Sequence, residues 1–193
     1  MSRLDSFIRR LEAQRACLNL AANLVRELEG EVLELGLGNG RTYDHLRELF
    51  PNRAIYVCER SVAAHPDCMP PPELLLLGDM RETLPGARAW LAGHVALAHL
   101  DMGTGDLVSS KALADELAPL ITPLLRLDGV LVSEPALALA ELSPLRLPDE
   151  VEPGRYHLYR RVSLQSPPSP GHGRTLSSNC GSPGKHGFPR VHR

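Results

Sequence analysis

A short glycine-rich stretch holds the residues best suited to binding a nucleotide-like ligand. Residues 31–40 start as an apolar run interrupted by Glu34, and glycines then alternate with other residues at Gly36, Gly38 and Gly40. Glycine permits positive φ and leaves room for a ligand close to the backbone. The N–H groups at the start of a following helix face such a ligand. The stretch therefore predicts a strand, a turn and a helix start that together form a ligand site.

The glycine spacing separates the possible ligands. A dinucleotide fingerprint, G-x-G-x-x-G, needs its third glycine where this chain has Arg41. The Gly-Lys-Ser/Thr ending of a phosphate-binding P-loop is absent as well. The pattern is instead acid-x-Gly-x-Gly-x-Gly. A nicotinamide-dependent oxidoreductase is thus disfavoured, although it remains an alternative at this point.

Two further acids follow the next two apolar runs. Glu59 ends the run at 54–58, about 20 residues after Gly40, where a carboxylate can accept both hydroxyls of a ribose. Asp79 comes shortly after the run at 74–77 and precedes Met80. Taken singly, such acids are more often loop residues that face water. Their order behind the glycine turn makes a shared site the better interpretation.

In this order the three strand ends resemble the class I S-adenosylmethionine-dependent methyltransferases. The resemblance implies that the glycine loop wraps the amino-acid end of the cofactor, with Glu34 holding the methionine ammonium through the loop, directly or through water. It implies that Asp79 accepts from the adenine amino group and that Met80 lies near the ring. The cofactor-binding residues implied in this way are Glu34, Gly36, Leu37, Gly38, Gly40, Glu59, Asp79 and Met80.

Longer stretches resemble a small bacterial family of compact class I methyltransferases whose substrate is not established. The resemblance covers residues 1–162, which we expect to form the methyltransferase domain. The stretches that carry it are 34–46, 63–68, 77–84 and 101–106.

The fourth apolar run ends at Asp101, which is the candidate catalytic residue. By resemblance, this strand end lies beside the methyl group, where a carboxylate could act as a general base. Asp101 could instead only cap the next segment. His99, inside the apolar run, is more often a core histidine than a base. Glu134 at the next strand end gives only a second acid, without the usual Asp-Asn pair, so no metal site is predicted.

Strand and helix patterns alternate behind residue 30 and position these residues. Such alternation predicts an α/β fold with a doubly wound, mostly parallel, Rossmann-like sheet. By resemblance, an antiparallel hairpin closes the sheet, and here it is abbreviated. Strands are expected near 31–35, 54–58, 74–77, 95–100, 129–133 and 156–162, and helices near 41–50, 84–92 and 108–126.

The first 30 residues show apolar side chains at helical spacing, and Gly30 ends the pattern. We expect this N-terminal helix to lie across the start of the sheet. By resemblance, such a segment covers the cofactor. Gln14 and Arg15 are the polar positions on it that could reach the site.

The composition changes at residue 165. Residues 165–193 are rich in proline, glycine and serine, contain no acid, and predict a disordered basic tail. Its four basic residues give the tail a formal charge of +4. Because the whole chain carries −2, residues 1–164 carry −6. An acidic domain makes nucleic acid an unlikely partner.

The remaining composition points to a cytoplasmic protein. Apolar runs stay well short of the roughly 20 residues needed to span a bilayer, so no membrane partner is expected. The four cysteines show neither C-x-x-C nor zinc spacing, which suits a reducing compartment.

We therefore predict a cytoplasmic S-adenosylmethionine-dependent methyltransferase acting on a small molecule, because no insertion is large enough to form a substrate domain. The oligomeric state stays open. The non-catalytic alternative is a Rossmann-like protein that acts through protein contacts.

Overall fold

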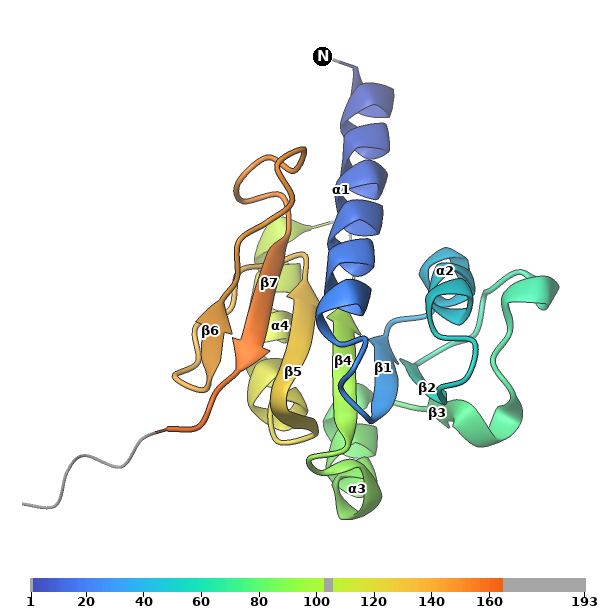
Figure 1. Ribbon diagram of the computed structural model, residues 1–193. Helices are drawn as coiled ribbons and strands as arrows, with labels where there is room; N and C mark the ends of the chain where they lie inside the picture. The colour runs from blue at the N-terminus through green and yellow to red at the C-terminus, as the bar shows by residue number, and fades with distance from the viewer. Residues whose placement is uncertain (1, 103–105, 165–193) are drawn as a thin grey trace, which may run out of the picture.

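The computed structural model describes residues 2–102 and 106–164, and these form one sheet with helices on both faces (Figure 1). The predicted tail at 165–193 lies outside the described residues, as do residues 103–105 of the stretch at 101–106. The strands are β1 (Glu31–Leu35), β2 (Ile55–Glu59), β3 (Leu75–Leu77), β4 (Val95–Leu100), β5 (Leu125–Ser133), β6 (Leu142–Pro144) and β7 (His157–Arg161).

The strand order is β3-β2-β1-β4-β5-β7-β6. The first five strands run parallel, and β7 pairs antiparallel with both β5 and β6. The chain thus winds from β1 to β3 in one direction, crosses back to β4 on the other side of β1, and continues to β5 in the opposite direction. This is the doubly wound arrangement predicted from the alternating pattern. The short β6, which no periodicity had indicated, completes the abbreviated antiparallel hairpin.

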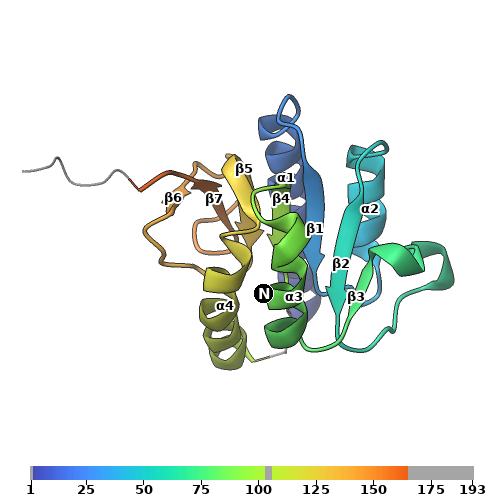
Figure 2. The ribbon, with the colours of Figure 1, turned by 90° about the horizontal axis from the view of Figure 1, so that it is seen from below.

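Two helices cover each face of the sheet (Figure 2). Helices α1 (Arg3–Leu24) and α2 (Arg41–Leu49) bury one apolar layer, and α3 (Met80–Leu91) and α4 (Leu107–Ile121) bury the other. Two short 3₁₀ helices, η1 (Pro66–Cys68) and η2 (Pro72–Leu74), shape the proline-rich connection between β2 and β3. No helix in the described ranges is long and apolar enough to cross a membrane.

Helix α1 extends past the ends of the strands (Figure 1). A capping box starts it, because the Ser2 hydroxyl accepts from the Asp5 N–H at 3.0 Å and the Asp5 carboxylate accepts from the Ser2 N–H at 3.0 Å. Its inner face buries Ala13, Gln14, Cys17, Leu18 and Ala21. The helix ends at Leu24, so it is shorter than the predicted 1–30.

Other helix boundaries differ from the sequence prediction. Helix α3 starts at Met80 rather than 84, because the Asp79 carboxylate accepts from the Arg81 N–H at 2.9 Å and caps the helix earlier. Helix α4 ends at Ile121 and β5 already starts at Leu125. A register shift between β4 and β5 at this end interrupts the alternation that would have revealed the strand start.

Candidate active site

The glycine turn forms one wall of a cavity at the carboxyl ends of the strands. Added Cβ atoms show what each glycine does: at Gly36 the atom would lie 2.8 Å from the Asp101 carbonyl oxygen, and at Gly40, where φ is +85°, it would lie 2.5 Å from Cys68 Cβ. At Gly38 it would meet no atom within 4 Å. Gly36 and Gly40 therefore let neighbouring chain segments pack, and Gly38 faces open space.

The cavity runs from the glycine turn to the underside of α1. Its volume is about 500 Å³, within the roughly 300–1,000 Å³ that small-molecule sites occupy. The ends of β1, β2, β3 and β4 contribute to it, together with α3, α4, the first turn of α2 and the first half of α1. Among the lining residues are Phe7, Arg10, Leu11, Gln14, Gly36, Leu37, Gly38, Glu59, Asp79, Met80, Asp101, Leu113 and Leu117.

Glu59 lies against the glycine turn. One oxygen of its carboxylate accepts from the Leu37 N–H at 2.8 Å and the Gly38 N–H at 3.2 Å, and the other accepts from the Ser61 N–H at 2.9 Å. Burial raises the pKa of Glu59, but these backbone N–H groups more than offset it, so the net pKa lies below the usual value. The Glu59 carboxylate is therefore ionised and held in place beside the turn.

Asp79 and Met80 follow β3 and line the cavity. Besides capping α3, the Asp79 carboxylate contacts the Arg81 guanidinium at 3.4 Å. Arg81 in turn binds Glu116 of α4 at 2.6 Å. These contacts fix Asp79 at the edge of the cavity, next to the apolar side chain of Met80.

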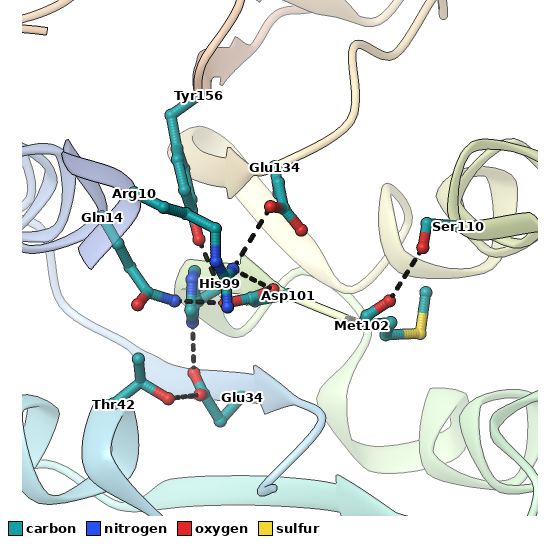
Figure 3. Close-up of polar contacts among 10 residues, drawn as sticks. All are labelled: Arg10, Gln14, Glu34, Thr42, His99, Asp101, Met102, Ser110, Glu134 and Tyr156. Atoms are coloured by element: carbon teal, nitrogen blue, oxygen red, sulfur yellow. Dashed lines mark hydrogen bonds and ion pairs between the residues drawn. The ribbon is translucent and has the colours of Figure 1, made fainter. Parts of the chain in front are cut away.

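Glu34 does not reach the cavity surface. It is fully buried, one oxygen accepts from the Thr42 hydroxyl of α2, and the other lies 2.7 Å from His99 Nδ1 (Figure 3). The carboxylate thus ties the start of α2 to β4 beneath the glycine turn. Any contact with a ligand would have to run through the loop.

Asp101 is the centre of a charged network under α1 (Figure 3). Arg10 Nη1 lies 3.2 Å from Asp101 Oδ2 and 3.2 Å from Glu134 Oε1. The Tyr156 hydroxyl donates to Asp101 Oδ2 at 3.1 Å, and the Gln14 amide donates to the same oxygen. Helix α1 therefore reaches both strand-end acids.

The electrostatics of this network follow from its burial. Burial, followed by the nearby Asp101 charge, raises the pKa of Glu134. Burial raises the pKa of Tyr156 as well, so its hydroxyl remains a neutral donor. Arg10 lies between the two acids and accounts for their close approach. Within residues 2–102 and 106–164, no group of three or more His, Cys, Asp or Glu is arranged to hold a metal ion.

Comparison with known proteins identifies the family. A family model described as S-adenosyl-L-methionine methyltransferase matches residues 1–161. The crystal structure of an S-adenosyl-L-methionine methyl transferase from Silicibacter pomeroyi DSS-3 is 45% identical, covers 83% of this chain and 99% of its own, and has a TM-score of 0.80. The chain belongs to the S-adenosyl-L-methionine methyltransferases.

Two other solved structures show a weaker similarity to this methyltransferase. A 16S rRNA (adenine(1408)-N(1))-methyltransferase from Catenulisporales acidiphilia is 12% identical, with a TM-score of 0.45 over 77% of this chain and 93% of its own. A Burkholderia thailandensis 1,6-didemethyltoxoflavin-N1-methyltransferase is 15% identical, with a TM-score of 0.38 over 79% and 81%. No curated protein matches the sequence.

The cavity of the methyltransferase suits its methyl donor, S-adenosylmethionine. The open space above Gly38 could admit a ligand to the backbone, and the ionised Glu59 carboxylate could accept from hydroxyls. Met80, Leu113 and Leu117 form an apolar part of the wall that could pack against an aromatic base. The family match also decides between the enzymatic alternatives, since it favours methyl transfer over hydride transfer.

The structure brings most of the predicted site residues of the methyltransferase to one cavity. Gly36, Leu37, Gly38, Glu59, Asp79, Met80 and Asp101 line it, whereas Glu34 lies below it and Gly40 packs against η1. Of the two polar residues on α1, Gln14 reaches Asp101 and Arg15 is exposed.

Sequence reasoning missed Arg10 and Tyr156. Arg10 precedes Gln14 by one helical turn, so the two share a face of α1, and that spacing was the available signal. Tyr156 is the first residue of the predicted last strand and directly precedes β7, and nothing in the local sequence distinguishes it from a core tyrosine. Its role depends on the pairing of β7 with β5.

Proposed function

We propose that the methyl acceptor is a small molecule that binds at the α1 end of the cavity, beside Asp101. The observation that carries this proposal is the position of Phe7, Arg10 and Gln14, which continue the cavity wall beyond the strand ends. An acceptor must enter this recess to reach the strand ends. A compact molecule with a polar nucleophile fits such a recess better than an extended macromolecular surface does.

The proposed roles on the donor side follow the cavity wall. Glu59 would accept the ribose hydroxyls, Asp79 would accept from the adenine amino group, and Met80 would pack beside the ring. Leu37 and Gly38 would present backbone to the amino-acid end, and Gly36, Gly40 and Glu34 would hold this turn in shape. Once bound, the donor supplies an electrophilic methyl group on a positively charged sulfur.

Asp101 has one oxygen suited to meet the acceptor. Its Oδ2 accepts from Arg10, Gln14 and Tyr156, whereas Oδ1 accepts from Arg10 at 3.3 Å. Oδ1 would accept a proton from an acceptor hydroxyl or amine, and Oδ2 would keep the carboxylate oriented. Methyl transfer is an in-line displacement, so most of the acceleration would come from this positioning.

The charge of the domain supports the choice of acceptor. Residues 1–164 carry a formal charge of −6. The acids Asp101 and Glu134 lie at the proposed acceptor end. A negatively charged surface repels a phosphate backbone. A small neutral or basic acceptor meets no such repulsion.

A label-transfer experiment tests the proposal. The protein is incubated with methyl-labelled donor and a cell extract that ultrafiltration has divided into small-molecule and macromolecular fractions. We expect labelled product in the small-molecule fraction only, and an Asp101→Asn variant should reduce its formation. Label found only on protein or RNA would overturn the small-molecule assignment.

A further inference from the structure

Two polar residues lie directly beneath the site, on the central strands. Glu34 of β1 and His99 of β4 are register partners, and both side chains point to the face covered by α1 and α2. Side chains alternate between faces, so the next positions on this face are Gly36 and Asp101. The pair thus forms the layer immediately below the cavity wall.

One ring nitrogen of His99 has no hydrogen-bond partner among the described residues. The ring is fully buried, Nδ1 lies 2.7 Å from Glu34 Oε2, and Nε2 has no hydrogen-bond partner in the part of the chain that the structure describes. Figure 3 shows this nitrogen on the side of the ring away from Glu34, toward Gln14, Asp101 and Tyr156. A buried polar atom without a partner costs about 1–3 kcal/mol, so it calls for an explanation.

The charges around His99 come from every element packed against it. Glu34 faces it from β1, Arg10 from α1, Glu134 from the end of β5, Tyr156 from the start of β7, and Asp101 from its own strand. Burial lowers the pKa of His99, but the Glu34 carboxylate opposes this through its charge and its hydrogen bond. Asp101 adds to that effect and Arg10 subtracts from it, so the net pKa lies above the usual value.

We propose that His99 is a positioning residue that holds a proton beneath Asp101 when the donor is absent and releases it to solvent when the positively charged donor binds. The Nε2–H bond is the one that breaks, and Glu34 keeps accepting from Nδ1–H. The reason is charge competition, because the sulfonium and the imidazolium would both lie next to Asp101. The inference rests on the proposed place of Asp101 beside the methyl group.

The consequence concerns donor and product. S-adenosylmethionine carries a positive sulfur and S-adenosylhomocysteine a neutral one, and the two molecules otherwise differ by one methyl group. A protonated His99 penalises the donor alone. The ratio of their affinities therefore reports the proton on His99, and contacts shared by the two ligands cancel.

Calorimetry on the whole protein measures this ratio. Both nucleosides are titrated from about pH 5.5 to about pH 9 at fixed ionic strength. We expect the preference for the donor over the product to increase about tenfold as the pH rises, which corresponds to a one-unit difference in the pKa of His99 between the two complexes. Near the midpoint, buffers of different ionisation enthalpy should show proton release with the donor and less with the product.

Two histidine variants, one in β4 and one just before it, provide the test and its control. His99→Gln removes the titrating group and should make the ratio independent of pH. His94→Gln changes an exposed histidine in the turn before the same strand and should leave the pH dependence as in the unchanged protein. If His99→Gln does not fold, histidine NMR of the unchanged protein replaces it, and the His99 pKa should fall more with donor than with product.

The outcomes are distinct. A constant ratio in the unchanged protein, or a His99 pKa that responds equally to both nucleosides, overturns the inference and leaves the donor assignment intact. Failure of both nucleosides to bind overturns the donor assignment as well. The identity of the acceptor is tested separately by label transfer, so a macromolecular acceptor would not alter this result.

Discussion

The two halves of the strand-end cavity are built in different ways. At the ends of β1, β2 and β3, the wall consists of turns, backbone N–H groups and the partly exposed acids Glu59 and Asp79. At the ends of β4 and β5 it consists of side chains that bond to one another, with Asp101 at their centre. We call these the donor half and the acceptor half.

The difference lies in the distance along the sequence between partners. In the donor half, Glu59 bonds to residues two, 21 and 22 positions away. In the acceptor half, Asp101 meets Tyr156, Gln14 and Arg10 at separations of 55, 87 and 91 residues, and Arg10 meets Glu134 at 124. The donor half is therefore a local motif, and the acceptor half is a product of the complete fold.

The largest expected loss of stability comes from a change at Glu34, which lies beneath both halves of the cavity. Glu34→Ala leaves the fully buried His99 without its charge partner and Thr42 without its acceptor. We expect a loss of about 3–5 kcal/mol in the free energy of unfolding, measured by urea denaturation. Glu31→Ala, at the half-buried start of the same strand, should cost under about 0.5 kcal/mol. Equal losses would mean that the buried pair adds nothing to stability.

The donor half should be sensitive to backbone shape. Gly40→Ala combines a left-handed backbone, worth about 1–2 kcal/mol, with overpacking against Cys68, worth about 1–3 kcal/mol. Gly93→Ala is the matched control, since its φ is +71° but its added Cβ meets no atom within 4 Å. Thermal unfolding should show the larger loss for Gly40→Ala. Similar losses in the two variants would show that the close approach to Cys68 does not add to the cost of Gly40→Ala.

A substitution at Glu59 should separate binding from folding. Glu59→Ala removes a charge-assisted acceptor from the cavity, and we expect donor affinity to weaken by roughly 1.5–3 kcal/mol, measured by calorimetry. Glu73→Ala, an exposed acid in η2, should bind the donor normally. Unchanged affinity in a folded Glu59→Ala protein would refute the ribose assignment.

The smallest effect is a pH dependence of stability, with opposite signs for two histidines. The pKa of His99 is raised by folding, so its contribution is complete below the unfolded value of about 6.5 and is lost as the pH rises through the folded-state pKa. Burial lowers the pKa of His157, so its charge disfavours folding at low pH. Urea denaturation of His99→Gln and His157→Gln across this pH range should show opposite trends relative to the unchanged protein. Parallel trends would contradict both assignments.

The donor half was within reach of the sequence, because a turn, a strand end and a helix start are local patterns. The five parallel strands and the glycine turn were predicted from residues 31–133, and the fold class is confirmed. The roles of Glu59, Asp79 and Asp101 remain predictions, although all three line the cavity.

The contacts that join the residues of the acceptor half were out of reach for a physical reason. Arg10, Glu134 and Tyr156 meet only because α1 crosses the strand ends and β7 pairs antiparallel with β5. No local spacing encodes such a meeting. Burial also sets what Glu34 contacts, since its carboxylate pairs with His99 beneath the glycine turn. Its contact with the donor through the loop stays a prediction.

The place of β7 in the sheet has a consequence for synthesis of the protein. A polypeptide leaves the ribosome from its amino end, and β7 lies between β5 and β6 although it is made after both. Arg10, Gln14 and Asp101 therefore emerge well before Tyr156 can donate to Asp101. A nascent chain could therefore form the donor half early, but the acceptor half is complete only after β7 has inserted between β5 and β6.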